Sequence, residues 1–130
     1  MRYFPIDAGV AFDCVGSDLL KIDWSVARLA ADFILDEARA IRVRFDGSTI
    51  IRLLDEMPLS TEGADPASVE GLVSNHFAYR VEGAVFSATQ SEVYKDVFGP
   101  VEHYRFVTGW GCMDVLTGVA PTFEVVDCEG

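Results

Sequence analysis

The chain has 130 residues and a formal net charge of −11, and half of its residues are apolar. This size and composition predict one folded domain over residues 1–130 rather than a disordered chain. The negative charge argues against nucleic acid and anionic lipid as partners, because both carry the same sign. No apolar run reaches the roughly 20 residues of a membrane span, so no membrane association is expected.

The negative charge lies almost entirely in the second half of the sequence. Residues 1–52 carry 8 Asp/Glu and 7 Lys/Arg, whereas residues 53–130 carry 13 and 3. Charge complementarity speeds association and selects partners, so this asymmetry predicts a non-enzymatic interaction module that binds a basic protein partner. Eight of the ten cations are arginines, whose planar fork grips carboxylates, and some of them are expected to form structural ion pairs.

Cysteine usage and the N-terminus bear on the cellular compartment. The chain contains three widely spaced cysteines: Cys14, Cys112 and Cys128. Their odd number and spacing favour neither a disulfide framework nor a zinc site. Pro5 and Asp7 interrupt the N-terminal residues, so no signal peptide is expected. These features together predict a cytoplasmic protein with reduced thiols.

Residues 24–38 fit two structures. The spacing of Val26, Leu29 and Phe33 matches one face of a helix that Asp23 or Ser25 would cap. The same region also fits a strand that enters a turn at the charged residues 36–39. We expect a strand over residues 32–36.

Residues 40–56 have the pattern of a β-hairpin. Apolar residues alternate with arginines up to Asp46–Gly47, and an apolar run resumes at Ile50. A three-residue loop over 46–48 would place Val43 opposite Ile51. A helix over residues 50–57 is the alternative, and the β-branched residues 49–51 argue against it.

The second half combines short helices with strands. Helices are predicted after Asp65–Pro66 and over Ser91–Phe98, and strands over residues 76–82, 103–116 and 122–126. Gly109–Gly111 is expected to mark a bulge or bend in the long strand. The whole chain therefore predicts an α+β, mainly β fold. We expect an antiparallel curved sheet or partly closed barrel of six to eight strands, with two or three short helices.

Two similar segments, each beginning with a histidine, contain the main candidates for chemistry. Alternation would place two residues of each strand on one face: His76 with Arg80, and His103 with Arg105. In a suitable register these four side chains would form a positive island that binds a small carboxylate or phosphate. The alternative function is therefore a small-anion binder or a modest enzyme. Routine cross-strand pairing of these arginines with nearby glutamates is the simpler interpretation.

Three further residues lie near this island in the sequence. Tyr79 and Asp114 are candidates to border it, and burial would raise the pKa of Asp114 toward that of a general acid or base. We expect instead an exposed or structurally paired Asp114, with the general acid or base as the alternative. Trp110, between two glycines, is expected in the core, and an exposed binding platform is the alternative.

Other classes of site have no local signature in this sequence. Common metal-ligand spacings, nucleophile motifs and phosphate-binding loops are absent from it, so neither a metal nor a cofactor is expected. Unpaired edges of the apolar strands would allow a homo-oligomer.

Overall fold

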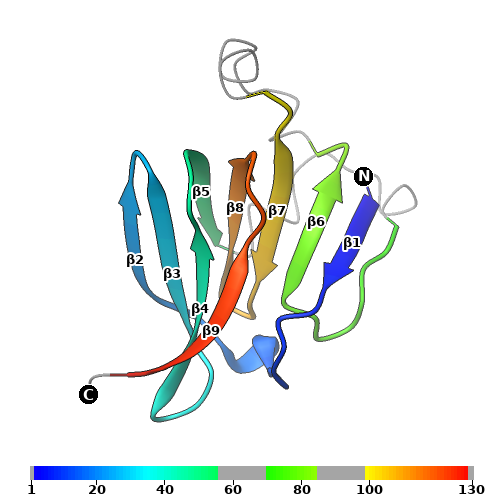
Figure 1. Cartoon of the computed structure of the whole chain (residues 1–130). Coiled ribbons are helices and arrows are strands. Elements are labelled where there is room, and N and C mark those ends of the chain that lie inside the picture. Colours follow the sequence, from blue (N-terminus) through cyan, green and yellow to red (C-terminus); the bar gives the residue numbers. More distant parts are fainter. Residues whose placement is uncertain (1, 56–69, 85–98, 129–130) are drawn as a thin grey trace.

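The computed structural model of the protein describes residues 2–55, 70–84 and 99–128. These residues form nine strands and one short 3-10 turn, η1 (Cys14–Gly16). The strands build two antiparallel sheets that pack face to face (Figure 1). The five-stranded sheet has the order β1 (Arg2–Ile6), β6 (Ala78–Glu82), β7 (Glu102–Val107), β8 (Gly111–Thr117) and β5 (Thr49–Asp55). The four-stranded sheet has the order β2 (Leu19–Ser25), β3 (Arg28–Ile34), β4 (Arg39–Phe45) and β9 (Thr122–Asp127).

The two sheets enclose a common apolar core. Alternate residues of β3 and β4 face inward and are fully buried: Leu29, Ala31, Phe33, Ile41, Val43 and Phe45. They pack against residues of the five-stranded sheet and its approach: Phe77, Ala78, Tyr104, Phe106, Met113 and Val115. The same alternation turns the charged residues of β3 and β4 outward, so the sheets are apolar inside and charged outside.

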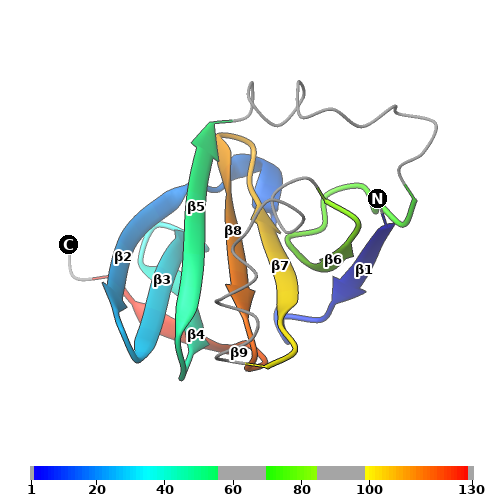
Figure 2. The same cartoon turned by 90° about the horizontal axis from the view of Figure 1, so that it is seen from above.

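One side of the sandwich is tied together by its edge strands. Seen from above, β2 and β3 lie beside β5 (Figure 2). The indole Nε1 of Trp24 on β2 donates to the Thr49 hydroxyl on β5 at 3.0 Å. The two sheets thus remain separate but are joined at this side by a side-chain hydrogen bond.

The hairpin predicted over residues 40–56 has the expected loop but not the expected pairing. β4 pairs with β3 and β9, whereas β5 pairs with β8 in the other sheet. Both strands turn apolar residues toward the core, so they face each other across the sandwich instead of lying side by side. Gly47 in this crossing packs against Val119, which follows β8, and an added Cβ would lie 3.0 Å from Val119 Cγ1. The chain passes between the sheets twice here, in the β4–β5 loop that contains Gly47 and in the β8–β9 loop that contains Val119. These two loops therefore pack against each other.

The long strand predicted over residues 103–116 is a tight hairpin. β7 ends at Val107 and β8 begins at Gly111, and the Thr108 hydroxyl accepts hydrogen bonds from the amides of Trp110 and Gly111. A Cβ on Gly109 would lie 2.0 Å from the Val15 carbonyl oxygen, so only glycine fits there. The glycines mark a chain reversal rather than a bulge, and this changes the face to which Asp114 belongs.

The predicted α+β class and the curved sheet or partly closed barrel are wrong. The described residues form two open sheets and contain no α-helix. The helical pattern near residue 29 arose because the outward residues Ala30 and Ile34 are apolar as well; residues 28–34 are strand β3. The helices predicted after Asp65 and over Ser91–Phe98 lie outside the described residues. No helix in the described part of the chain could span a membrane.

Candidate functional site

Five side chains converge on the outer face of the five-stranded sheet. Asp114 Oδ1 accepts hydrogen bonds from His103 Nε2 and Arg105 Nε, each at 2.7 Å. Asp114 Oδ2 accepts from Arg52 Nη2 at 2.7 Å and from Arg52 Nε at 3.1 Å. Arg105 Nη1 donates to the Tyr3 hydroxyl at 2.6 Å. We call these five residues the Asp114 cluster.

Strand register builds the Asp114 cluster. Arg52, Asp114 and Arg105 lie directly opposite one another on β5, β8 and β7. His103 shares their face because it is two residues before Arg105 on β7. Opposite charges at directly paired positions attract each other across the strands. The cluster is therefore a row of alternating charge whose members come from distant parts of the chain.

Burial and charge together fix the ionisation of the cluster. Asp114 is 0% exposed and Arg105 is 1% exposed. Burial by itself raises the pKa of the Asp114 carboxyl, but the hydrogen bond from His103 and the charge of Arg105 outweigh it and lower the pKa to about 2. Burial by itself lowers the pKa of the Arg105 guanidinium, but Asp114 raises it above its usual value. The pKa of Asp114 is thus lowered rather than raised, and this carboxylate is unsuited to proton transfer near neutral pH.

The predicted positive island does not assemble. β6 and β7 do pair, but the register places Arg80 opposite Tyr104, on the other face from Arg105. Arg80 Nη1 instead lies 2.7 Å from Glu82 and 3.4 Å from Glu102. The pair with Glu82 lies within β6, and the pair with Glu102 on β7 is a cross-strand pair of the kind that the simpler interpretation expected.

His76 and Tyr79 lie beside each other at the start of β6. His76 Nε2 is 3.0 Å from the Ile6 carbonyl oxygen, and its ring packs against Tyr79 with centroids 5.0 Å apart. Tyr79 is directly opposite Arg105, but its hydroxyl donates to the Val73 carbonyl oxygen at 2.9 Å. Burial raises the pKa of the Tyr79 hydroxyl. The structure therefore brings together His103, Arg105 and Asp114, with Tyr79 at their border.

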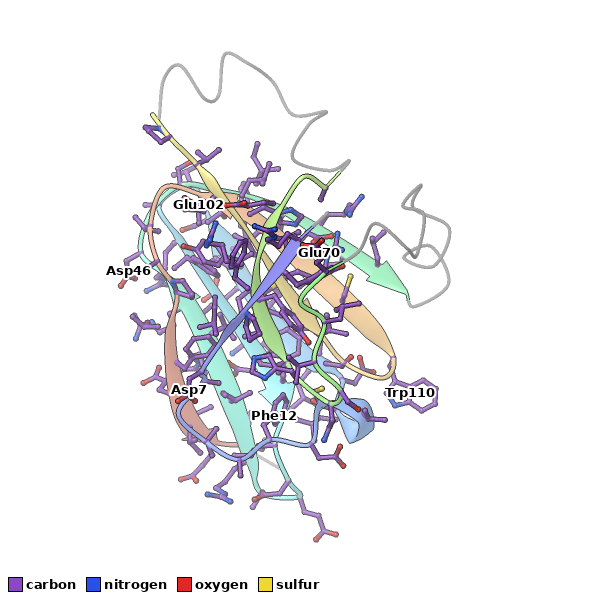
Figure 3. The ribbon with its side chains drawn as sticks, turned by 90° about the vertical axis from the view of Figure 1, so that its right-hand side faces the viewer. Asp7, Phe12, Asp46, Glu70, Glu102 and Trp110 are labelled. Carbon is purple, nitrogen blue, oxygen red and sulfur yellow. The ribbon has the colours of Figure 1, made fainter. Side chains whose placement is uncertain are left out.

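Trp110 is exposed, contrary to the expected core position. It stands at the tip of the β7–β8 turn and projects from the molecule (Figure 3), with 69% of its surface accessible. It borders a hollow of about 320 Å³ whose other apolar residues include Leu53 and Met113. Trp110 is exposed because it lies in the turn between β7 and β8, which was not expected from the sequence.

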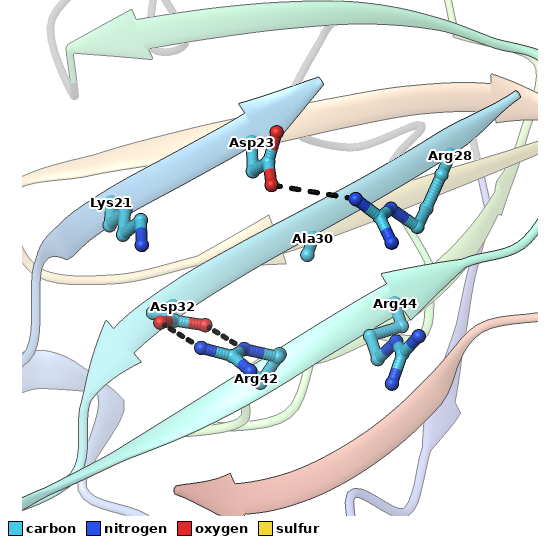
Figure 4. A pocket seen from close by; sticks show the side chains of 7 residues that line it. All are labelled: Lys21, Asp23, Arg28, Ala30, Asp32, Arg42 and Arg44. Carbon is cyan, nitrogen blue, oxygen red and sulfur yellow. Dashed lines mark hydrogen bonds and ion pairs between the residues drawn. The ribbon is translucent and has the colours of Figure 1, made fainter. Parts of the chain in front are cut away.

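The charged residues that sequence reasoning missed lie on the outer face of the four-stranded sheet. Two adjoining depressions occupy this face and share Lys21, Asp32 and Arg42. The first, the cationic hollow (Figure 4), measures about 300 Å³ and is lined by Lys21, Asp23, Arg28, Ala30, Asp32, Arg42 and Arg44. The second, the acidic groove, measures about 750 Å³ and is lined by Leu20, Lys21, Asp32, Ile34, Asp36, Glu37, Ala40, Arg42, Asp127 and Cys128.

All eight arginines pair with carboxylates of this chain. Six have a carboxylate oxygen within 2.6–3.0 Å: Arg2, Arg39, Arg42, Arg52, Arg80 and Arg105. Arg28 and Arg44 have their carboxylates only at 3.6–3.9 Å. Several pairs join the two halves of the sequence, among them Arg2 with Glu70 and Arg44 with Glu124. These ion pairs bring acidic residues of the second half of the sequence next to arginines of the first half.

Arg52 could have been found from the sequence. It is the one charged residue in the apolar run Ile50–Leu54. A lone arginine in such a run needs a buried or half-buried carboxylate. The cationic hollow left no such signal, because its residues alternate with core residues as on any solvent-facing strand.

Within the described ranges, no group of three or more His, Cys, Asp or Glu side chains is arranged to hold a metal ion. The three cysteines form no disulfide, and Cys14 and Cys112 are buried. Burial is the main cause that raises the pKa of the Cys14 thiol, with the nearby Asp13 charge adding to it. A buried thiol with a raised pKa is a poor nucleophile.

No protein-family model matches this chain, and comparisons with curated proteins and with solved structures find no match either. The candidate sites must therefore be weighed by their own chemistry. The Asp114 cluster satisfies its carboxylate internally, whereas the outer face of the four-stranded sheet presents charged groups to solvent.

Proposed function

We propose that this protein is a non-enzymatic interaction module that binds a basic segment of a partner protein in the acidic groove. The observation that carries the proposal is the pairing of all eight arginines with carboxylates of the chain. With a net charge of −11, the charge left over for a partner is negative. A basic surface would be drawn to it and oriented by it.

The acidic groove suits the side chains of such a partner. Its lining combines the apolar side chains of Leu20 and Ile34 with the exposed carboxylates of Glu37 and Asp127. Neither of these two carboxylates forms an ion pair within the described residues. A lysine or arginine could pack its apolar stem against Leu20 or Ile34 and place its charged head beside these carboxylates. Asp36, by contrast, is already held by Arg39 at 2.6 Å.

The same charge argues against nucleic acid and anionic lipid as ligands. Three cysteines without disulfides suit a reducing compartment, and we place the protein in the cytoplasm on this ground. A second copy of the chain, paired along an edge strand, is the competing occupant that the experiment must distinguish.

The test compares two variants that each remove two negative charges. Glu37→Gln with Asp127→Asn alters the acidic groove, whereas Asp7→Asn with Asp13→Asn alters exposed carboxylates of the β1–η1 loop. Each protein is immobilised, exposed to lysate, and eluted in a salt series with identification by mass spectrometry. Circular dichroism checks that both variants fold.

The proposal expects a basic protein that elutes with rising salt, is lost from the groove variant and is retained by the loop variant. Equal loss from both variants would mean that only net charge matters, and would overturn the groove as the site. Retention of nothing salt-sensitive, or of the chain itself alone, would overturn the partner proposal.

A further inference from the structure

The cationic hollow owes its shape to one small residue. Arg28, Ala30 and Asp32 are successive outward residues of β3, and Ala30 lies directly opposite Asp23 on β2 and Arg44 on β4. Ala30 carries only a methyl group, so the long side chains around it rise above a depression of about 300 Å³ (Figure 4). The depression is open to solvent and is therefore reachable by a small molecule.

Cations outnumber carboxylates among the residues that line the hollow, and Glu124, which does not line it, lies 3.6 Å from Arg44 and 3.9 Å from Arg42. The seven lining residues include four cations and two carboxylates. The whole chain, in contrast, has 21 Asp/Glu against 10 Lys/Arg. Four of the ten Lys and Arg residues of the protein therefore lie around Ala30.

Three of the four cations keep hydrogen-bond donors for a ligand. Arg28 Nη2 is 3.7 Å from Asp23, and the nearest carboxylate oxygen to Arg44, on Glu124, is at 3.6 Å. Both separations exceed a hydrogen-bond length. Lys21 has no carboxylate within ion-pair distance in the described part of the chain. Arg42 is different, because it binds both oxygens of Asp32 at 2.7 and 3.0 Å.

We infer that the cationic hollow binds a small oxyanion with two negative charges, held by Arg28, Arg44 and Lys21. Two guanidinium groups present paired N–H donors that match the oxygens of a phosphoryl group or of carboxylates, and the ammonium adds a third charge. Asp32 does not oppose such a ligand strongly, because Arg42 neutralises it. The Asp23 carboxylate at the rim can accept a hydrogen bond from a hydroxyl of the ligand.

This inference is independent of the proposed basic partner. The ligand has the opposite charge, and Arg28 and Arg44 line only the cationic hollow, although Lys21 lines both depressions. Loss of one activity leaves the other measurable.

The test is a titration of the labelled protein, followed by amide NMR, with pyrophosphate, inorganic phosphate and succinate at constant ionic strength. The expected shifts fall on residues 21, 28–32 and 42–44, with a dissociation constant on the order of a millimolar. Arg28→Gln with Arg44→Gln should weaken binding at least tenfold. Arg2→Gln with Arg39→Gln removes two exposed arginines elsewhere and should leave it within twofold.

A second variant protects the test against a folding failure. Ala30→Leu fills the hollow and keeps every charge, so it should also weaken binding at least tenfold while the protein stays folded. Equal responses to the phosphates and succinate support a general dianion site, and a response to one class alone identifies a phosphoryl or a carboxylate ligand. Shifts spread over all cations, or equal weakening in the control variant, would overturn the inference.

Discussion

Two rows of alternating charge cross this protein, one on each sheet, and only one of them is shielded from water. The row on the five-stranded sheet consists of Arg52, Asp114 and Arg105. The row on the four-stranded sheet consists of Lys21, Asp32, Arg42 and Glu124. In each row, a central carboxylate accepts two hydrogen bonds from an arginine directly opposite on the next strand. Arg52 donates to Asp114 and Arg42 donates to Asp32.

Burial gives the two rows different roles. The Asp114 side chain is fully buried and Arg105 is 1% exposed, whereas Asp32 keeps 12% of its side chain exposed and its partner Arg42 keeps 32%. A buried charge that loses its partner stays uncompensated, but an exposed one regains water. The same kind of cross-strand pair is therefore expected to contribute more to stability on the five-stranded sheet than on the four-stranded sheet.

The sharpest test of this contrast exchanges one atom in each row. Asp114→Asn leaves two arginines near a neutral amide and should lower the free energy of unfolding by about 3–5 kcal/mol. Asp32→Asn should lower it by less, because Arg42 is 32% exposed to water and also lies 3.9 Å from Glu124. Urea denaturation measures both, and equal losses would contradict the distinction between the rows.

The second prediction concerns pH. The pKa of Asp114 is lowered in the folded protein from its ordinary 3.8 to about 2. Its contribution to stability is therefore complete above about pH 4 and is lost as the pH falls through about 2. The difference is worth roughly 2 kcal/mol. Urea denaturation at stepped pH should show this loss in the native sequence and a shallower slope in Asp114→Asn; parallel curves would mean that Asp114 titrates normally.

The edge of the Asp114 cluster should matter less than its centre. Tyr3→Phe removes the hydroxyl that accepts a hydrogen bond from Arg105 and should lower the unfolding free energy by about 1–2 kcal/mol. Tyr104→Phe is the matched control, because the Tyr104 hydroxyl has no hydrogen-bond partner among the described residues. An equal cost for both variants would place the effect of Tyr3 in packing rather than in the cluster.

The smallest expected effect is at the exposed tryptophan. Trp110→Ala should change stability by no more than about 0.5 kcal/mol, because the side chain stands in solvent at a turn. Thermal unfolding measures the change. A loss of several kcal/mol would mean that the indole is part of a buried structure in solution.

Local alternation could be predicted from the sequence, but the pairing of strands could not. The inward residues of β4 and its loop at 46–48 follow from the pattern alone. A three-residue loop serves equally for a hairpin and for a crossing between sheets, and the choice depends on β9, far along the chain. That long-range partner has no local signature.

The site shows the same division. His103 and Arg105 share a face as alternation predicts, because both lie on one strand. A continuous strand over residues 103–116 would place Asp114 on the face of Phe106, whereas the turn at residues 108–110 pairs it with Arg105. The cationic hollow depends on three strands in register, which no single stretch of sequence encodes.

The arginine side chains themselves provide the most direct measurement. NMR of the Nε–H groups near pH 7 should show slow hydrogen exchange for the buried Arg105 and fast exchange for Arg28 and Arg44. Added pyrophosphate should shift the signals of Arg28 and Arg44 and leave Arg105 in place. Fast exchange at Arg105, or a pyrophosphate shift centred on it, would contradict the assignment of folding to one face and binding to the other.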